Sequence, residues 1–252
     1  MNIASKTTLA LIALLSSVQA WAHPQEARVA VELESADHAQ AGAVQVDFDL
    51  LDLKKKIVLK DTDLEVTHEK LLHCFVYDPA LKEFRHEHPT FDGSMWHFST
   101  DLPVDGNYWV FFQGQLASDH SEFAASTRIL VSGGQPANAD EPELGDVRTG
   151  ADGISVATLS NTALNAGQTA MLTLAFSRND GTAPVITPFL GEQAHIVITP
   201  SDGDSLIHVH PMVMGGKLMI HVAFPEEGDY RVWVQFMDGG TLRTVPLSVT
   251  VN

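Results

Sequence analysis

Cysteine is almost absent from this chain of 252 residues, and the single Cys74 cannot form a disulfide within one molecule. Positive charge is also scarce, because 15 Lys and Arg stand against 32 Asp and Glu, and the formal net charge is −17. An acidic surface argues against nucleic acid or an anionic membrane as a partner, and it is compatible with the attraction of cations. After residue 22, no apolar run is long enough to span a membrane and no glycine loop could cradle a phosphate.

The first 22 residues have the pattern of a cleaved signal peptide. Lys6 supplies a basic start, Leu9 to Val18 form a short apolar run, and Ala20-Trp21-Ala22 is a small-residue cleavage motif. The pattern predicts export, most simply to a bacterial periplasm, and a protein that is soluble after cleavage. His23 would then be the first residue, where its α-amine and ring could together chelate copper. An ordinary terminus that begins with His is the alternative.

The rest of the chain is an internal duplication. One stretch recurs after a constant offset of about 122 residues, without a gap, as expected of a repeat. The offset relates Leu102-Pro103 to Phe224-Pro225 and Tyr108 to Tyr230. Each copy preserves three histidines, and these are the candidate metal ligands: His73, His86 and His88 in the first copy, and His195, His208 and His210 in the second.

Both copies read as short β-rich runs separated by turn residues, and neither contains a convincing helical period. About seven strands per copy predict an all-β protein with two tandem immunoglobulin-like β-sandwich domains. We expect the first domain at residues 23–131 and the second at 151–252. Residues 132–150, rich in small, acidic and helix-breaking residues, are predicted to be the linker.

The three histidines of each copy fall on one predicted β-hairpin. In the first copy, a four-residue turn at residues 78–81 would place His73 opposite His86, with His88 two residues further on the same face. A turn at residues 200–203 gives the second copy the same arrangement. Imidazoles at such spacings can converge on one ion. The alternative is a hydrogen-bonded histidine layer that only the fold requires.

The opposite faces of the hairpin have different expected roles. Cys74 adjoins His73 and therefore points the other way, which predicts a core thiol rather than a metal ligand. The histidine face of the first copy also carries Phe75, Tyr77 and Phe84, and we interpret it as directed towards the core of the sandwich.

Further ligands differ between the copies. His68 is a candidate fourth ligand in the first copy, but Leu190 stands at the matching position of the second. Met219 is a candidate ligand in the second copy, which also carries Met212 and Met214. Thioether sulfur beside imidazole suits copper, particularly Cu(I), whereas core packing is the alternative for these methionines.

The motifs HEKLLH at residues 68–73 with HEHP at 86–89, and LGEQAH at 190–195 with HVHP at 208–211, carry a resemblance. They resemble duplicated units of uncharacterised bacterial secreted or periplasmic proteins that are commonly linked with copper or other heavy-metal handling. The resemblance implies that the three histidines of each copy, and His68, belong to a metal site.

We therefore expect a metal-binding protein, not an enzyme, that buffers copper or transfers it to another periplasmic or membrane metal-handling protein. Binding should weaken below about pH 6, where imidazoles become protonated. One alternative is a zinc-dependent hydrolase or a redox enzyme, for which Glu69 and Glu87 are the nearby candidate bases. Another is an immunoglobulin-like module that binds a protein without metal.

Overall fold

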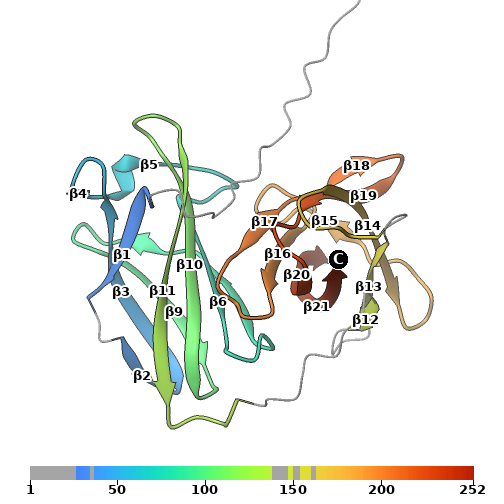
Figure 1. The fold of residues 1–252 in the computed structure, drawn as a ribbon, viewed down its shortest axis with the longest axis horizontal. Coiled ribbons are helices and arrows are strands. Elements are labelled where there is room, and N and C mark those ends of the chain that lie inside the picture. The colour runs from blue at the N-terminus through green and yellow to red at the C-terminus, as the bar shows by residue number, and fades with distance from the viewer. Residues whose placement is uncertain (1–26, 35–36, 138–146, 150–153, 160–162) are drawn as a thin grey trace, which may run out of the picture.

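The computed structural model describes residues 27–34, 37–137, 147–149, 154–159 and 163–252. The predicted signal peptide and His23 lie outside these residues. The described chain forms two units, the first from residue 27 to 137 and the second from residue 147 to 252, which lie side by side (Figure 1). No helix of the described residues is long and apolar enough to cross a membrane.

The first unit consists of two antiparallel sheets with one parallel pair, β2 with β11. One sheet contains β1 (Val29–Leu33), β3 (Gly42–Asp52), β4 (Ile57–Val58), β8 (Thr90–Phe91) and β9 (Trp96–Leu102). The other contains β2 (His38–Gln40), β5 (Leu64–Glu65), β6 (Leu72–Tyr77), β7 (Phe84–Glu87), β10 (Gly106–Leu116) and β11 (Glu122–Ser132).

The second unit repeats this plan. One sheet contains β12 (Val147–Thr149), β13 (Ile154–Leu159), β14 (Thr169–Arg178), β18 (Met212–Met214) and β19 (Lys217–Ala223). The other contains β15 (Ile186–Thr187), β16 (His195–Pro200), β17 (Ile207–Val209), β20 (Gly228–Asp238) and β21 (Thr241–Val251). Within the segment predicted as a linker, residues 147–149 form β12, which pairs with β13.

The prediction of a duplicated, all-β, immunoglobulin-like sandwich is confirmed. The described residues contain no α-helix, and one 3₁₀ turn, η1 (Asp61–Asp63), precedes β5. Each unit has its own apolar core between its two sheets, because alternate residues of each strand point inward. The thiol of Cys74 lies in the first core, as predicted, and its burial raises its pKa.

Strand β6 is buried on both faces, although only one face points into a sandwich. Leu72, Cys74 and Val76 belong to the core of the first unit. The alternate residues, among them Phe75 and Tyr77, belong instead to a third apolar cluster that joins the two units. The interpretation of the histidine face as core-directed is therefore wrong: this face packs against the other copy.

The third cluster, which we call the interface cluster, combines residues of both units. Its members are Phe75, Tyr77, Leu81, Phe84 and Phe111 of the first unit and Val197, Leu206 and Trp233 of the second. The Trp233 ring stacks on Phe84 and Tyr77, with centroid distances of 4.8 and 5.3 Å. The Tyr77 hydroxyl donates a hydrogen bond to the carbonyl oxygen of Gly203 at 2.7 Å. An apolar contact of this kind holds the two histidine-bearing sheets face to face.

The hairpins have the predicted strands but a different register. Phe75, not His73, lies opposite His86, and Val197 lies opposite His208. The first loop is longer than a four-residue turn because the Asp78 carboxylate accepts hydrogen bonds from the backbone N–H groups of Ala80, Lys82 and Glu83. A register shift of two residues keeps every side chain on its predicted face. The histidines therefore still share one face.

Candidate metal centre

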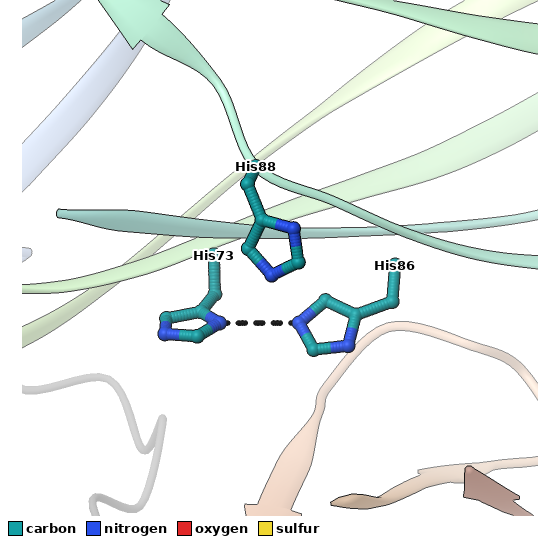
Figure 2. A group of neighbouring side chains, drawn as sticks. All are labelled: His73, His86 and His88. Atoms are coloured by element: carbon teal, nitrogen blue, oxygen red, sulfur yellow. Dashed lines mark hydrogen bonds between the residues drawn. The ribbon is translucent and has the colours of Figure 1, made fainter. Parts of the chain in front are cut away.

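The first triad consists of His73 near the start of β6, His86 on β7 and His88 directly after β7 (Figure 2). Continuing the pairing of β6 with β7 by one residue places His88 level with His73, and His86 is two residues before His88 on the same face. One nitrogen from each ring lies within 4.8 Å of the other two. The Nδ1 atom of His73 is 3.1 Å from the Nε2 atom of His86.

His195, His208 and His210 form the second triad in the same way on β16 and β17. The Nδ1 atom of His195 lies 3.2 Å from Nε2 of His208 and 3.0 Å from Nε2 of His210. Two nitrogens bound to one metal at about 2.1 Å, with an angle between 90° and 109°, are about 3.0–3.4 Å apart. The spacing within each triad therefore suits a common ion.

The outer ring nitrogens face oxygen atoms that can only accept a hydrogen bond. Nε2 of His73 donates to the backbone carbonyl of Thr67 at 3.0 Å, and Nε2 of His195 donates to that of Phe189 at 2.9 Å. Carbonyl acceptors of this kind fix the tautomer of a histidine ligand. Both histidines therefore present an unprotonated Nδ1 to their triad.

The histidines at the centre of each hairpin are fixed by the other unit. Nδ1 of His86 donates to Oε1 of Gln235 at 2.9 Å, and Nδ1 of His208 donates to Oε1 of Gln113 at 3.1 Å. Gln235 presents its oxygen to His86 because its amide nitrogen donates to Thr244. The two glutamines are themselves related by the duplication, so each copy orients a histidine of the other.

With these hydrogen bonds in place, the inner nitrogens of His73 and His86 face each other with their lone pairs. A neutral imidazole carries one N–H, and in His73 and His86 that N–H is already donated outward. The 3.1 Å contact between their inner nitrogens then has no proton of its own. Nε2 of His88 is buried and has no hydrogen-bond partner among the described residues. A cation between them would satisfy these buried nitrogens.

Burial keeps the six rings neutral. It lowers the pKa of His73 and His195 to about 4, that of His88 to about 3 and that of His210 to about 2. For His86 and His208, burial and the charge of neighbouring histidines lower the pKa well below its usual range. The deprotonated form that a metal requires therefore persists into acid. These pKa values predict that metal binding weakens at a lower pH than the value of about 6 expected from free imidazoles.

The two triads meet across the junction of the units. Ring centroids of His86 and His195 are 5.3 Å apart, and those of His73 and His208 are 6.0 Å apart. Within a triad the corresponding distances are 4.5–5.4 Å. The triads are therefore neighbouring halves of one six-histidine centre, not distant sites in separate domains.

His68 lies at this centre but on the side of the second triad. Its ring is 4.0 Å from that of His210 and 6.1 Å from that of His73. His68 Nδ1 is 3.3 Å from a carboxylate oxygen of Glu192, and a nitrogen of His210 completes a third group of possible ligands. Nothing in the sequence connects His68 with the second copy, because that contact depends on how the units dock.

Met219 lies elsewhere. It is on β19, paired with Met212 of β18 and Thr173 of β14, in the sheet opposite the one that carries β16 and β17. Its neighbours Leu218 and Ile220 pack towards the core of the second unit, so Met219 points to the outer side of that sheet. The structure thus groups Met219 with Met212 rather than with the triad.

The structure also shows where the two candidate bases, Glu69 and Glu87, lie. Glu87 faces away from the triad and accepts a hydrogen bond from Thr100. Glu69 follows His68 in a tight turn. Sequence reasoning missed Gln113 and Gln235, although their separation by the repeat offset was a visible signal. It also missed Glu192, whose counterpart in the first copy is Lys70.

Comparisons with known proteins give a family but no activity. The profile of a domain of unknown function, DUF8832, matches residues 24–131 and 149–252. No curated protein matches the chain.

Solved structures give weak similarity only. An α-2-macroglobulin from Salmonella is 12% identical with a TM-score of 0.26; the match covers 88% of this chain but only 15% of that one. Latent PorU from Porphyromonas gingivalis is 13% identical with a TM-score of 0.30, covering 90% of this chain and 24% of that one. Fibronectin(III)-like modules of Clostridium thermocellum CbhA are 14% identical with a TM-score of 0.22, covering 88% and 94%. Scores this low carry no argument about function.

Proposed function

The chain belongs to the DUF8832 family, whose name assigns no activity, and from the site itself we propose that it binds metal ions in its six-histidine centre. Each triad holds one ion, and the protein buffers the metal or passes it to another metal-handling protein. The predicted signal peptide supports a periplasmic location for this role.

One observation carries the proposal. In each triad the outer nitrogens of two histidines are hydrogen-bonded to oxygen acceptors, so their inner nitrogens, 3.1–3.2 Å apart, have no proton between them. A hydrogen-bonded histidine layer would instead alternate donors and acceptors around the ring. A cation at each triad satisfies all the lone pairs at once.

Copper is the metal that we propose, with zinc as the alternative. Imidazole nitrogen suits both, and nitrogen sites bind Cu²⁺ more tightly than the other divalent ions of the first transition row. The sequence resemblance to proteins linked with copper handling points the same way. Three ligands leave each ion an open position through which it can be exchanged with a partner.

Metal content tests the proposal. We would purify the mature protein from the periplasm and measure its metals by plasma mass spectrometry, beside a His86→Ala/His208→Ala double variant. Copper in the wild type and its loss from the variant are expected. A wild-type protein that also fails to take up added copper or zinc would contradict the proposal and leave the histidines as structural residues.

The close approach of the triads favours one second candidate, a two-metal enzyme. Two ions held side by side can activate water on one ion while the other stabilises charge. Glu192, close to His210, supplies a carboxylate for such a reaction, whereas Glu87 does not. Hydrolysis of simple esters and phosphoesters by the zinc-loaded protein, and its loss in the double histidine variant, would support this candidate. Copper content without any such activity favours buffering or transfer.

A further inference from the structure

We propose that His68, Glu192 and His210 form a third metal site, open to solvent, through which a divalent cation enters the six-histidine centre on the side of the second triad. This entry site rests on the proposed metal binding. It adds a route and a direction to that function.

The three side chains offer a mixed ligand set built from both units. His68 comes from the first unit, and Glu192 and His210 come from the second. Their ligand atoms lie within 4.8 Å of one another, and His68 Nδ1 is 3.3 Å from Glu192 Oε1. Two imidazoles and a carboxylate suit divalent zinc or copper. The carboxylate also balances part of the charge of an arriving cation.

The entry site is more exposed than the innermost histidine of each triad. The side chains of His68 and Glu192 are 36% and 30% exposed, whereas His73 and His195 are 2% and 0% exposed. The other triad histidines are half-buried, so His68 is the most exposed of the possible ligands. The proposed site is therefore placed where an ion begins to exchange water for protein ligands.

His210 belongs to both sites. It is a member of the second triad, with its Nε2 atom 3.0 Å from Nδ1 of His195, and it is also a member of the entry site. An ion bound by His68, Glu192 and His210 can reach the triad by exchanging His68 and Glu192 for His195 and His208 while His210 remains close. Stepwise exchange avoids a fully dehydrated, unliganded ion.

Among the residues that the structure describes, the first triad has no matching set of additional ligands. The repeat offset relates His68 to Leu190 and Glu192 to Lys70, so the matching position beside His88 combines an apolar side chain with an ammonium group. Lys70 closes a tight turn with Thr67, whose carbonyl oxygen is 3.0 Å from His73 Nε2, so its charge lies near the first triad. A cation is repelled there. The residues at the two matching positions, Glu192 and Lys70, thus have opposite charge.

The backbone at His68 is left-handed, as it is at the matching Leu190 of the second copy, which limits the substitutions that can test its side chain. His68 and Glu69 have φ values of 47° and 65°, in a tight turn closed by hydrogen bonds between Thr67 and Lys70. The left-handed region is unfavourable for most residues other than glycine, and strain of this kind gathers at functional sites. In the second copy, Leu190 and Gly191 occupy the matching turn, so the turn itself is not what requires histidine.

The test uses substitutions matched by the repeat. His68→Asn and Glu192→Gln remove ligands of the entry site, and asparagine tolerates the left-handed backbone. Leu190→Asn and Lys70→Gln place the same new residues at the matching positions of the other side. Bound copper is counted after equilibrium dialysis against Cu²⁺, and the loading rate is followed by stopped-flow absorbance.

We expect the wild type to bind two Cu²⁺ per chain at equilibrium, one per triad, because neutral His210 has one ring lone pair and serves one ion at a time. His68→Asn and Glu192→Gln should also bind two but load about tenfold more slowly. Leu190→Asn and Lys70→Gln should load at the wild-type rate. Unchanged loading in the entry-site variants would overturn the entry site but leave the triads intact. A wild type that binds no ion would instead overturn the proposed function. Equal unfolding midpoints check that the variants are folded.

Discussion

Acid should destabilise the metal-free protein through its buried histidines, well above the pH at which carboxylates are protonated. Burial lowers the pKa of His73 and His195 to about 4, against about 6.5 in an unfolded chain. As pH falls below 6.5, the unfolded state takes up protons that the folded state refuses, so the free energy of unfolding falls until pH approaches 4. Below pH 4 these two rings are protonated in both the folded and the unfolded state, so their contribution to the loss no longer grows.

The size of this effect follows from the two pKa values. At pH 5 each ring is almost fully protonated when unfolded and about one-tenth protonated when folded, which corresponds to about 2 kcal/mol per ring relative to pH 7.5. His73 and His195 are both buried, so no discount for exposure applies, and together they give about 4 kcal/mol. Stoichiometric copper should remove the loss, because bound imidazoles do not accept protons.

Urea unfolding at pH 7.5 and pH 5, followed by tryptophan fluorescence in the presence of a chelator, measures the difference. A His73→Gln/His195→Gln double variant is the control, since other titrating groups remain and only these two contributions disappear. If the wild type and the variant lose equal stability between the two pH values, the buried, neutral state inferred for these rings is refuted.

Three further outcomes follow from the structure. Metal bound at neutral pH should be retained on dialysis at pH 5 and lost nearer pH 4, because the ligand pKa values are low; release at pH 6 would contradict this. Gln113→Leu and Gln235→Leu should each weaken copper binding about 10–100-fold, measured by competition with a chelator, whereas exposed Gln45→Leu should not. Trp233→Ala should cost about 3–5 kcal/mol and separate the unfolding of the two units, which calorimetry would show as two transitions; one unshifted transition would contradict the role of the interface cluster.

The fold was predictable because its signals are local and repeated. Alternating apolar residues and turn residues predict strands wherever one face is buried, and the offset then assigns the same plan to both copies. The hairpin register was not predictable from the turn residues. The Asp78 carboxylate binds three backbone N–H groups and widens the first loop, a tertiary detail that a four-residue turn pattern does not contain.

The triads were predictable even though the predicted register was wrong, because the error left every histidine on its predicted face. A shift of two residues preserves the face of every side chain, so His73, His86 and His88 converge in either register. The docking of the units was a different matter. Phe75 and Tyr77 gave an apolar face whose partner could be a second sheet of the same domain or another domain. Periodicity reports that a face is buried but not what covers it.

The duplication explains why neither copy could hold the centre alone. A separated first unit would expose Phe75, Tyr77 and Phe84 to water and would leave the outer nitrogen of His86 without Gln235. The second unit would lose Gln113 from His208 in the same way. Each copy therefore supplies three ligands to its own triad and the orienting amide to the other. The two copies have since diverged where symmetry is not needed, at His68 against Leu190 and Glu192 against Lys70. That divergence places a carboxylate on one side of an almost symmetric centre and an ammonium group at the matching position on the other.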